Sequence, residues 1–91
     1  MANTLPTIRV TAFDGDRELF SSSFQRDVIN IGKLARAQIR LEDSNVSRMH
    51  AVIEVTAEGK VEIADLNSTN GTYVNGEKVS RTVLHTGDQV R

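Results

Sequence analysis

The sequence contains no cysteine, which excludes both a disulfide framework and a thiolate metal site. Nothing therefore argues for an oxidising compartment, and we expect a protein of the reducing cytoplasm. No apolar run approaches the ~20 residues that a membrane-spanning helix needs, and Met1 is not followed by a secretory signal pattern. We accordingly expect no membrane partner for this chain.

The sequence also lacks an excess of charge of either sign. Its 11 Lys and Arg residues and 12 Asp and Glu residues give a net charge of -1, and the two signs are mixed along the chain. Nucleic-acid binding relies on clustered cations that neutralise phosphates, so we expect no nucleic-acid partner. A length of 91 residues is too short for two cores and predicts a single domain over residues 1–91.

The sequence does contain many short runs in which apolar and polar residues alternate, the period-2 pattern of strands with one buried face. Turns rich in Gly, Asn and Asp separate them, and no helical pattern extends beyond a turn or two. This arrangement predicts an all-β fold, either a sandwich or a barrel. The expected strands cover residues 7–12, 19–24, 28–31, 39–41, 51–55, 61–66, 73–74 and 78–79, with the beginning of another at 89–91.

Two polar loops interrupt these runs, at residues 47–50 (Ser-Arg-Met-His) and 67–72 (Asn-Ser-Thr-Asn-Gly-Thr). They place hydroxyl, amide and cationic donors at turns, which suits a site that holds a phosphate without reacting with it. Residues 67–72 are also compatible with an ordinary polar turn, in which the side chains bond their own backbone. They do not form a P-loop, because the Gly-x-x-x-x-Gly-Lys run is missing.

Catalytic and metal sites are poorly supported by the same residues. Ser47, His50 and an aspartate make a triad on paper, but no nucleophile elbow is present, so we expect no catalytic residue and no enzyme. His50 and His85 are the only histidines and lack metal-ligand spacing, so we expect no metal and no cofactor. We expect His50 to bond backbone and hold its loop, with direct ligand contact as the alternative.

Taken in order, five segments of the chain resemble the forkhead-associated (FHA) domain. The resemblance covers essentially the whole sequence and implies a sandwich of two twisted antiparallel sheets with about eleven strands. It also implies a non-catalytic module that recognises phosphothreonine in extended peptides through loops at one end. The matching segments are Ile31-Gly32-Lys33, Ile39-Arg40-Leu41, residues 46–51, residues 65–76 and residues 84–88.

The resemblance implies a role for nine residues. Residues expected to contact the phosphopeptide are Lys33, Ser47, Arg48, Thr69 and Asn70. Residues expected to support the site are Gly32, His50, Asp65 and Gly71.

The chain departs from the family pattern at two places. Lys33 stands where an arginine is usual, and a lysine cannot grip two phosphate oxygens with a planar fork. Arg36 or Arg48 would then be alternative sources of the cation. The family's last strand, which normally pairs beside the first, is cut off after Arg91. An open edge at residues 7–12 would follow, and with it a strand-exchanged dimer becomes an option.

The sequence therefore predicts a phosphothreonine-peptide-binding adaptor in Ser/Thr kinase-linked signalling, as the N-terminal part of a longer bacterial protein. The alternative prediction is a phospho-independent scaffold for assembly or dimerisation in a secretion or motility complex.

Overall fold

The computed structural model describes residues 5–14 and 16–90, and over these ranges it contains strands and turns but no helix. The all-β prediction is confirmed. No helix in this part of the chain is long and apolar enough to cross a membrane. The nine strands are β1 (Ile8–Asp14), β2 (Arg17–Phe24), β3 (Val28–Gly32), β4 (Ile39–Arg40), β5 (Ala51–Val55), β6 (Val61–Asp65), β7 (Thr72–Val74), β8 (Glu77–Val79) and β9 (Arg81–Val83).

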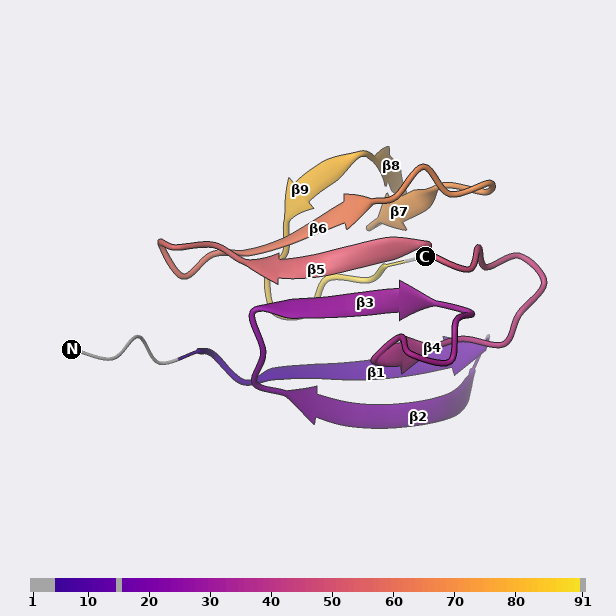
Figure 1. Ribbon diagram of the computed structural model, residues 1–91, viewed down its shortest axis with the longest axis horizontal. Coiled ribbons are helices and arrows are strands. Elements are labelled where there is room, and N and C mark those ends of the chain that lie inside the picture. Colours follow the sequence, from indigo (N-terminus) through magenta and orange to yellow (C-terminus); the bar gives the residue numbers. More distant parts are fainter. Residues whose placement is uncertain (1–4, 15, 91) are drawn as a thin grey trace.

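One layer of the molecule is a five-stranded sheet in the order β4-β3-β5-β6-β9 (Figure 1). Strands β3, β5, β6 and β9 pair antiparallel, whereas β4 runs parallel to β3. The parallel pair departs from the expected antiparallel sheets. It arises because residues 33–38 turn the chain back, with Ala37 N donating to Leu34 O at 3.0 Å, so that β4 starts beside β3 in the same direction.

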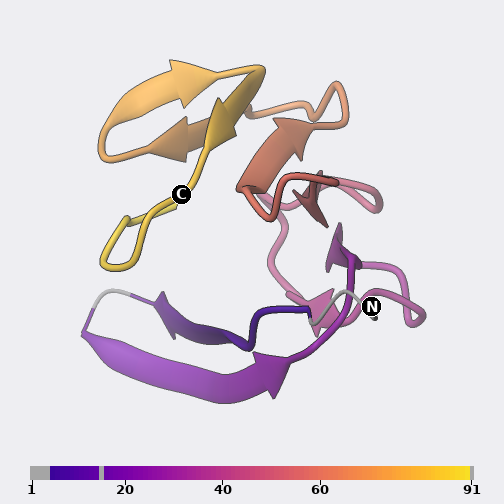
Figure 2. The same cartoon turned by 90° about the vertical axis from the view of Figure 1, so that its left-hand side faces the viewer.

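Two hairpins complete the sandwich opposite this sheet (Figure 2). Strands β1 and β2 form a hairpin with an irregular register between Ala12 and Phe13. Strands β7 and β8 form a tight hairpin around Asn75 and Gly76, whose φ angles of 50° and 87° suit the expected type I′ turn. Within the described ranges, β1 pairs with β2 alone, so its other edge carries no strand.

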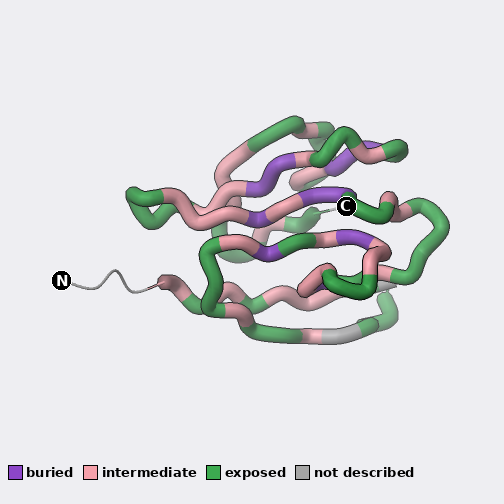
Figure 3. The backbone as a smooth tube through the Cα atoms, viewed as in Figure 1, coloured by how far each residue is buried: buried purple, intermediate pink, exposed green. Residues whose placement is uncertain are grey.

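The core lies between the layers and is centred on a row of isoleucines. Ile29 of β3 faces Ile53 of β5, which faces Ile63 of β6, and all three are at most 5% exposed (Figure 3). Burying such a side chain contributes roughly 1.5–3 kcal/mol each. The row therefore fixes the relative positions of three strands whose ends carry the loops described below.

The observed strand boundaries lie close to the predicted ones. The set of strands differs from the prediction in three respects. Strand β9 was not expected, and the strand expected at residues 89–91 is represented by one bridge between Val74 and Val90. Arg91 lies outside the described residues. The nine strands within the described residues are fewer than the eleven or so that the family resemblance implies.

Candidate functional site

Three loops meet at the end of the sheet where β3 and β6 finish and β5 begins (Figure 1). We call this end the site edge and define it as residues 33–38, 41–50 and 66–71. All five residues predicted to contact a phosphopeptide lie on it. Backbone and side-chain hydrogen bonds hold the three loops in place.

The first two loops are joined by backbone hydrogen bonds and a close approach at Gly32. Lys33 N donates to Ser47 O at 3.2 Å, and Leu34 N donates to Arg48 O at 3.3 Å. A Cβ atom at Gly32 would lie 2.0 Å from the carbonyl oxygen of Arg48, a distance that no real contact allows. Only glycine permits this close approach of the two loops.

His50 links the second loop to the third. Its side chain is 9% exposed, Ser47 N donates to Nδ1 at 3.0 Å, and Nε2 lies 2.9 Å from Gly71 O. Because Nδ1 accepts a hydrogen bond, the ring proton resides on Nε2 and is donated to Gly71 O. The backbone contacts expected of His50 are present, and they leave neither ring nitrogen for an external ligand.

Gly71 is the other half of this link. It is buried and has a φ of 83°, a left-handed conformation that favours glycine. This backbone geometry presents its carbonyl oxygen to His50.

Asp65 organises the third loop from the end of β6. Its carboxylate accepts hydrogen bonds from Ser68 N at 3.2 Å, from the Ser68 hydroxyl, and from Thr72 Oγ1 at 2.7 Å. Burial raises the pKa of the Asp65 carboxyl. The hydrogen bonds from Ser68 and Thr72 lower the pKa by more than this, so that it lies below its ordinary value of 3.8. Asp65 is therefore an anion that shapes the loop.

Two further side-chain contacts cross between the second and third loops. Thr69 N donates to Ser47 Oγ at 3.0 Å, and Asn70 Nδ2 donates to the backbone oxygen of Asn45 at 2.9 Å. Ser47 Oγ uses a lone pair in its contact, so its own hydrogen remains available to donate outward. Asn70 likewise keeps its Oδ1 acceptor.

The cations of the site edge are placed around these hydroxyl and amide groups. Lys33 is half-buried, whereas Arg48 and Arg36 are exposed. Among the side chains that the structure describes within residues 5–14 and 16–90, none of the three forms an ion pair. Each can therefore offer its charge to an incoming anion. The same ranges hold no cluster of His, Cys, Asp or Glu side chains suited to a metal ion.

Sequence reasoning missed several residues that shape the site edge. Ser68 and Thr72 donate hydrogen bonds to the Asp65 carboxylate. Asn67, directly before Ser68, takes a φ of 58°. A usable signal was the spacing Asp65-x-x-Ser68, in which a short side chain bonds backbone three residues on. No local pattern pointed to the bond between Asn45 and Asn70.

A comparison with known families decides the classification: the model of the FHA domain family matches residues 29–91. The chain belongs to the FHA domain family. Its sandwich is shared with solved FHA structures, including one from a study of phosphothreonine-dependent FHA domain interactions. That structure has a TM-score of 0.82 and 35% identity, with 94% of this chain and 86% of the other covered.

Two further relatives are bacterial proteins that this chain matches over part of their length. The oxoglutarate dehydrogenase inhibitor of Corynebacterium efficiens is 43% identical over 60 residues, which is 66% of this chain and 42% of the relative. FhaA of Mycobacterium tuberculosis is 48% identical over 62 residues, 67% of this chain and 11% of the relative. The FHA domain described here thus spans less than half the length of these curated relatives.

Proposed function

We propose that this FHA domain binds phosphothreonine in an extended peptide and acts as an adaptor in Ser/Thr kinase-linked signalling. The observation that carries the proposal is the 3.0 Å contact from Thr69 N to Ser47 Oγ. It brings together two loops that are distant in the sequence and sets their hydroxyl and amide groups at one edge. A solved FHA structure with 35% identity comes from work on phosphothreonine-dependent interactions, which supports the same function here.

The chemistry of the ligand fits the proposed donors. A phosphothreonine carries nearly two negative charges and three acceptor oxygens. The Ser47 and Thr69 hydroxyls would donate to these oxygens, and Lys33 or Arg48 would supply the positive charge. Charge-assisted bonds contribute roughly 1.5–3 kcal/mol each, so two or three account for much of the ~8 kcal/mol of micromolar affinity.

Asn70 has a second role in this proposal. Its Nδ2 donates a hydrogen bond to Asn45 O and so holds the second loop. Its Oδ1 would accept a hydrogen bond from a backbone N–H of the peptide beside the phosphothreonine. One side chain would then fix the loop and orient the ligand. Binding of this kind involves no bond making, and we propose a non-catalytic module that works in the bacterial cytoplasm within a longer protein.

Calorimetry with a phosphothreonine peptide library and its unphosphorylated twin tests the proposal. We expect binding of the phosphorylated peptides alone and a loss of at least tenfold in Ser47→Ala. The melting temperature should fall by only a few degrees, because one exposed bond is worth ~1 kcal/mol. Ser23→Ala, an exposed serine on β2, is the matched control and should bind as well as the parent. Equal binding of both libraries would overturn the proposal.

A second function, phospho-independent assembly, is favoured by Lys33 and by the edge of β1 that carries no strand within the described residues. Such an edge accepts a strand from another chain, which would give a strand-exchanged dimer. Sedimentation velocity distinguishes the two functions. A stable dimer that ignores both peptide libraries would support the scaffold.

A further inference from the structure

Within the described residues, the outer edge of strand β2 carries no strand. There β2 pairs with β1 alone, and it forms the lower margin of the molecule in both Figure 1 and Figure 2. It is also the longest of the described strands, with 8 residues. Its outer edge therefore presents a row of backbone N–H and C=O groups that suits pairing with a further strand.

This edge lacks the features that usually prevent pairing between molecules. Proteins protect long edge strands with prolines, charged side chains or bulges. Residues 19–24 (Leu-Phe-Ser-Ser-Ser-Phe) contain no proline and no charge. The irregular register of the hairpin lies near its turn, so residues 20–24 keep regular strand pairing. Leu19, Ser22 and Ser23 are exposed, which leaves the middle of the edge accessible.

Charged residues stand at the two ends of this edge, in an order that is complementary to a reversed copy of itself. Arg17 and Glu18 begin β2, while Arg26 and Asp27 follow its end. All four are exposed. Among the side chains that the structure describes, no ion pair includes Glu18, Arg26 or Asp27. When two copies of the strand run antiparallel, the beginning of each meets the end of the other, so basic residues face acidic ones.

The register that brings these charges together is centred on Ser22. In an antiparallel pair of identical strands, residues at equal distances on either side of the centre lie opposite each other. A centre at Ser22 therefore sets Glu18 against Arg26 and Arg17 against Asp27. Symmetry gives each of these pairs twice, and no residues of like charge are opposed.

Two observations favour this register. A centre at Ser21 would keep a single kind of charged pair, Asp16 with Arg26. Gln25 Nε2 donates to Leu5 O at 3.0 Å, so the chain still runs beside the segment before β1 after β2 has ended. The charges that follow β2 therefore remain near the line of the strand.

We propose that the outer edge of β2 pairs antiparallel with the same edge of a second copy of this chain, in the register centred on Ser22. The contact is isologous because each copy offers the same strand. A net charge of -1 leaves little repulsion between the copies. One pair of strands buries little surface, so we expect a weak, reversible dimer. The inference does not rest on the proposed phosphothreonine function, and it uses a different edge from the strand exchange considered for β1.

Such a dimer leaves both site edges uncovered. In Figure 1, β2 begins near the site edge and ends at the opposite end of the molecule. Because the paired strands run in opposite directions, the two site edges lie at opposite ends of the joined sheet. Each copy can then bind its own ligand.

Sedimentation velocity over a range of protein concentrations tests the pairing. We expect a reversible dimer whose dissociation constant rises at least tenfold in Ser22→Lys, because this change sets like charges opposite each other at the centre of the contact. Ser80→Lys changes an exposed serine outside β2 and is the matched control, which should dimerise like the parent. A chain that stays monomeric up to about 1 mM would overturn the inference.

A charge exchange tests the register. Glu18→Arg should weaken the dimer about fivefold, because the resulting repulsion with Arg26 occurs twice. Adding Arg26→Glu to the same chain restores opposite charges and should return the dissociation constant to that of the parent. Both effects should shrink at high salt. A double variant that dimerises no more tightly than Glu18→Arg would overturn the inference.

Single cysteines report the register directly, since the chain has none of its own. Opposite Cα atoms in an antiparallel pair lie about 4.5–5.5 Å apart, which a disulfide spans. Ser22→Cys should therefore link to itself when diamide oxidises the two thiols. Ser21→Cys and Ser23→Cys, each about 8 Å from its own copy, should link only when the two variants are mixed. Faster linking of Ser21→Cys to itself than of Ser22→Cys would overturn the inference.

Phosphopeptide binding separates this inference from the proposed function. Ser22→Lys should bind phosphothreonine peptides like the parent, because β2 lies outside the site edge. A dimer without any phosphopeptide binding would support the inference and count against the proposed function. A dimer that persists unchanged in Ser22→Lys pairs through another edge, such as that of β1, and overturns the inference while the proposed function stands.

Discussion

The loops of the site edge and the turn between β5 and β6, at the opposite end of the sheet, are held by hydrogen bonds of different range. At the site edge, bonds join residues 21, 22 and 25 positions apart: His50 to Gly71, Ser47 to Thr69, and Asn45 to Asn70. At the opposite end, residues 56–60 between β5 and β6 bond only to one another, with Lys60 N donating to Thr56 Oγ1 at 3.1 Å. A connecting turn needs only the second arrangement.

The difference shows which loops the fold holds in a fixed conformation. Long-range bonds between loops order many backbone torsions at once, which costs conformational entropy that a short turn avoids. Preorganised donors favour ligand binding, because the entropy of ordering the loops is not lost when the ligand binds. The fixed loops of the site edge are suited to the binding proposed for them, whereas the β5–β6 turn only connects two strands.

The largest expected effect is at Gly32. Gly32→Ala places a methyl group against the carbonyl of Arg48, and we expect a loss of about 3 kcal/mol or more in the free energy of unfolding. Gly59→Ala, in the opposite turn, meets nothing within 4 Å but has a φ of 84°, so it should cost only about 1 kcal/mol. Urea denaturation measures both. Equal losses would erase the contrast between the two ends.

His50 should give the next largest effect. His50→Ala removes both bonds to the ring and leaves the buried carbonyl of Gly71 unpaired, which should cost about 2–4 kcal/mol. Phosphopeptide affinity should fall with it, since Ser47 and Thr69 lose their common support. His85 has a side chain that is 78% exposed, and His85→Ala should change stability by less than about 0.5 kcal/mol. A His50 variant as stable as the parent would contradict the proposal that His50 links the second and third loops.

Asp65 makes the third loop sensitive to acid. Its pKa is lowered in the folded protein, so the unfolded chain binds the proton more tightly and acid favours unfolding. The contribution of Asp65 should be complete above its ordinary pKa of 3.8 and be lost as the pH falls through the lower folded-state value. The melting temperature of Asp65→Asn should therefore fall less steeply than that of the parent between neutral and acidic pH.

Asp88 provides the control for this pH dependence. Its pKa is also lowered, by bonds from the His85 backbone and the Asn75 side chain, but it lies outside the site edge. Asp88→Asn should likewise flatten the acid decline. It should leave phosphopeptide binding at neutral pH unchanged, whereas Asp65→Asn should weaken it.

The smallest expected effect is at Lys33. Lys33→Arg replaces a point charge with a planar fork, and we expect phosphopeptide binding to tighten by about threefold without a change in stability. Calorimetry at low and high salt measures it. If affinity stays the same in Lys33→Arg and drops in Arg48→Ala, Arg48 supplies the cation instead.

Much of the fold was predictable because the alternating runs are strong and local. The prediction of β5 over residues 51–55 matches the structure residue for residue, and the Asn75-Gly76 turn behaves as its φ preferences require. Strand β9 was missed because Arg81-Thr82-Val83 carries no alternating apolar pattern. Its place is marked by ion pairs from Arg81 to Glu54 and Glu62, which only the folded sheet brings together.

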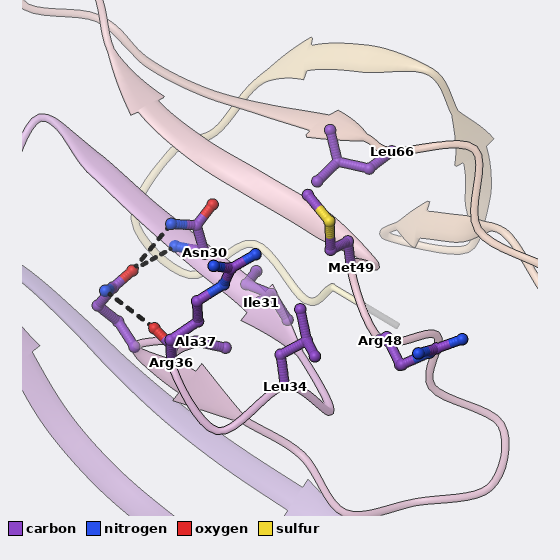
Figure 4. Close-up of a pocket in the computed structure, with 9 residues that line it drawn as sticks. Asn30, Ile31, Leu34, Arg36, Ala37, Arg48, Met49 and Leu66 are labelled. Carbon is purple, nitrogen blue, oxygen red and sulfur yellow. Dashed lines mark hydrogen bonds between the residues drawn. The ribbon is translucent and has the colours of Figure 1, made fainter.

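The candidate site divides in the same way. The positions of Ser47, Thr69 and Asn70 were expected from the family resemblance, and all three lie on the site edge. Their partners were not predictable, because a bond such as Asn70 to Asn45 depends on how separate loops pack. An apolar pocket beside them (Figure 4) was missed for the same reason, since its residues Leu34, Met49 and Leu66 belong to three different segments.

The contact between Thr69 N and Ser47 Oγ has a consequence for the strength of the proposed site as well as its shape. A hydroxyl that accepts a hydrogen bond becomes more polarised, and its own hydrogen becomes a stronger donor. The amide of the third loop thus increases the acidity that the Ser47 hydroxyl presents to a phosphate oxygen. Separating the two loops would weaken the donor electronically even if Ser47 itself did not move.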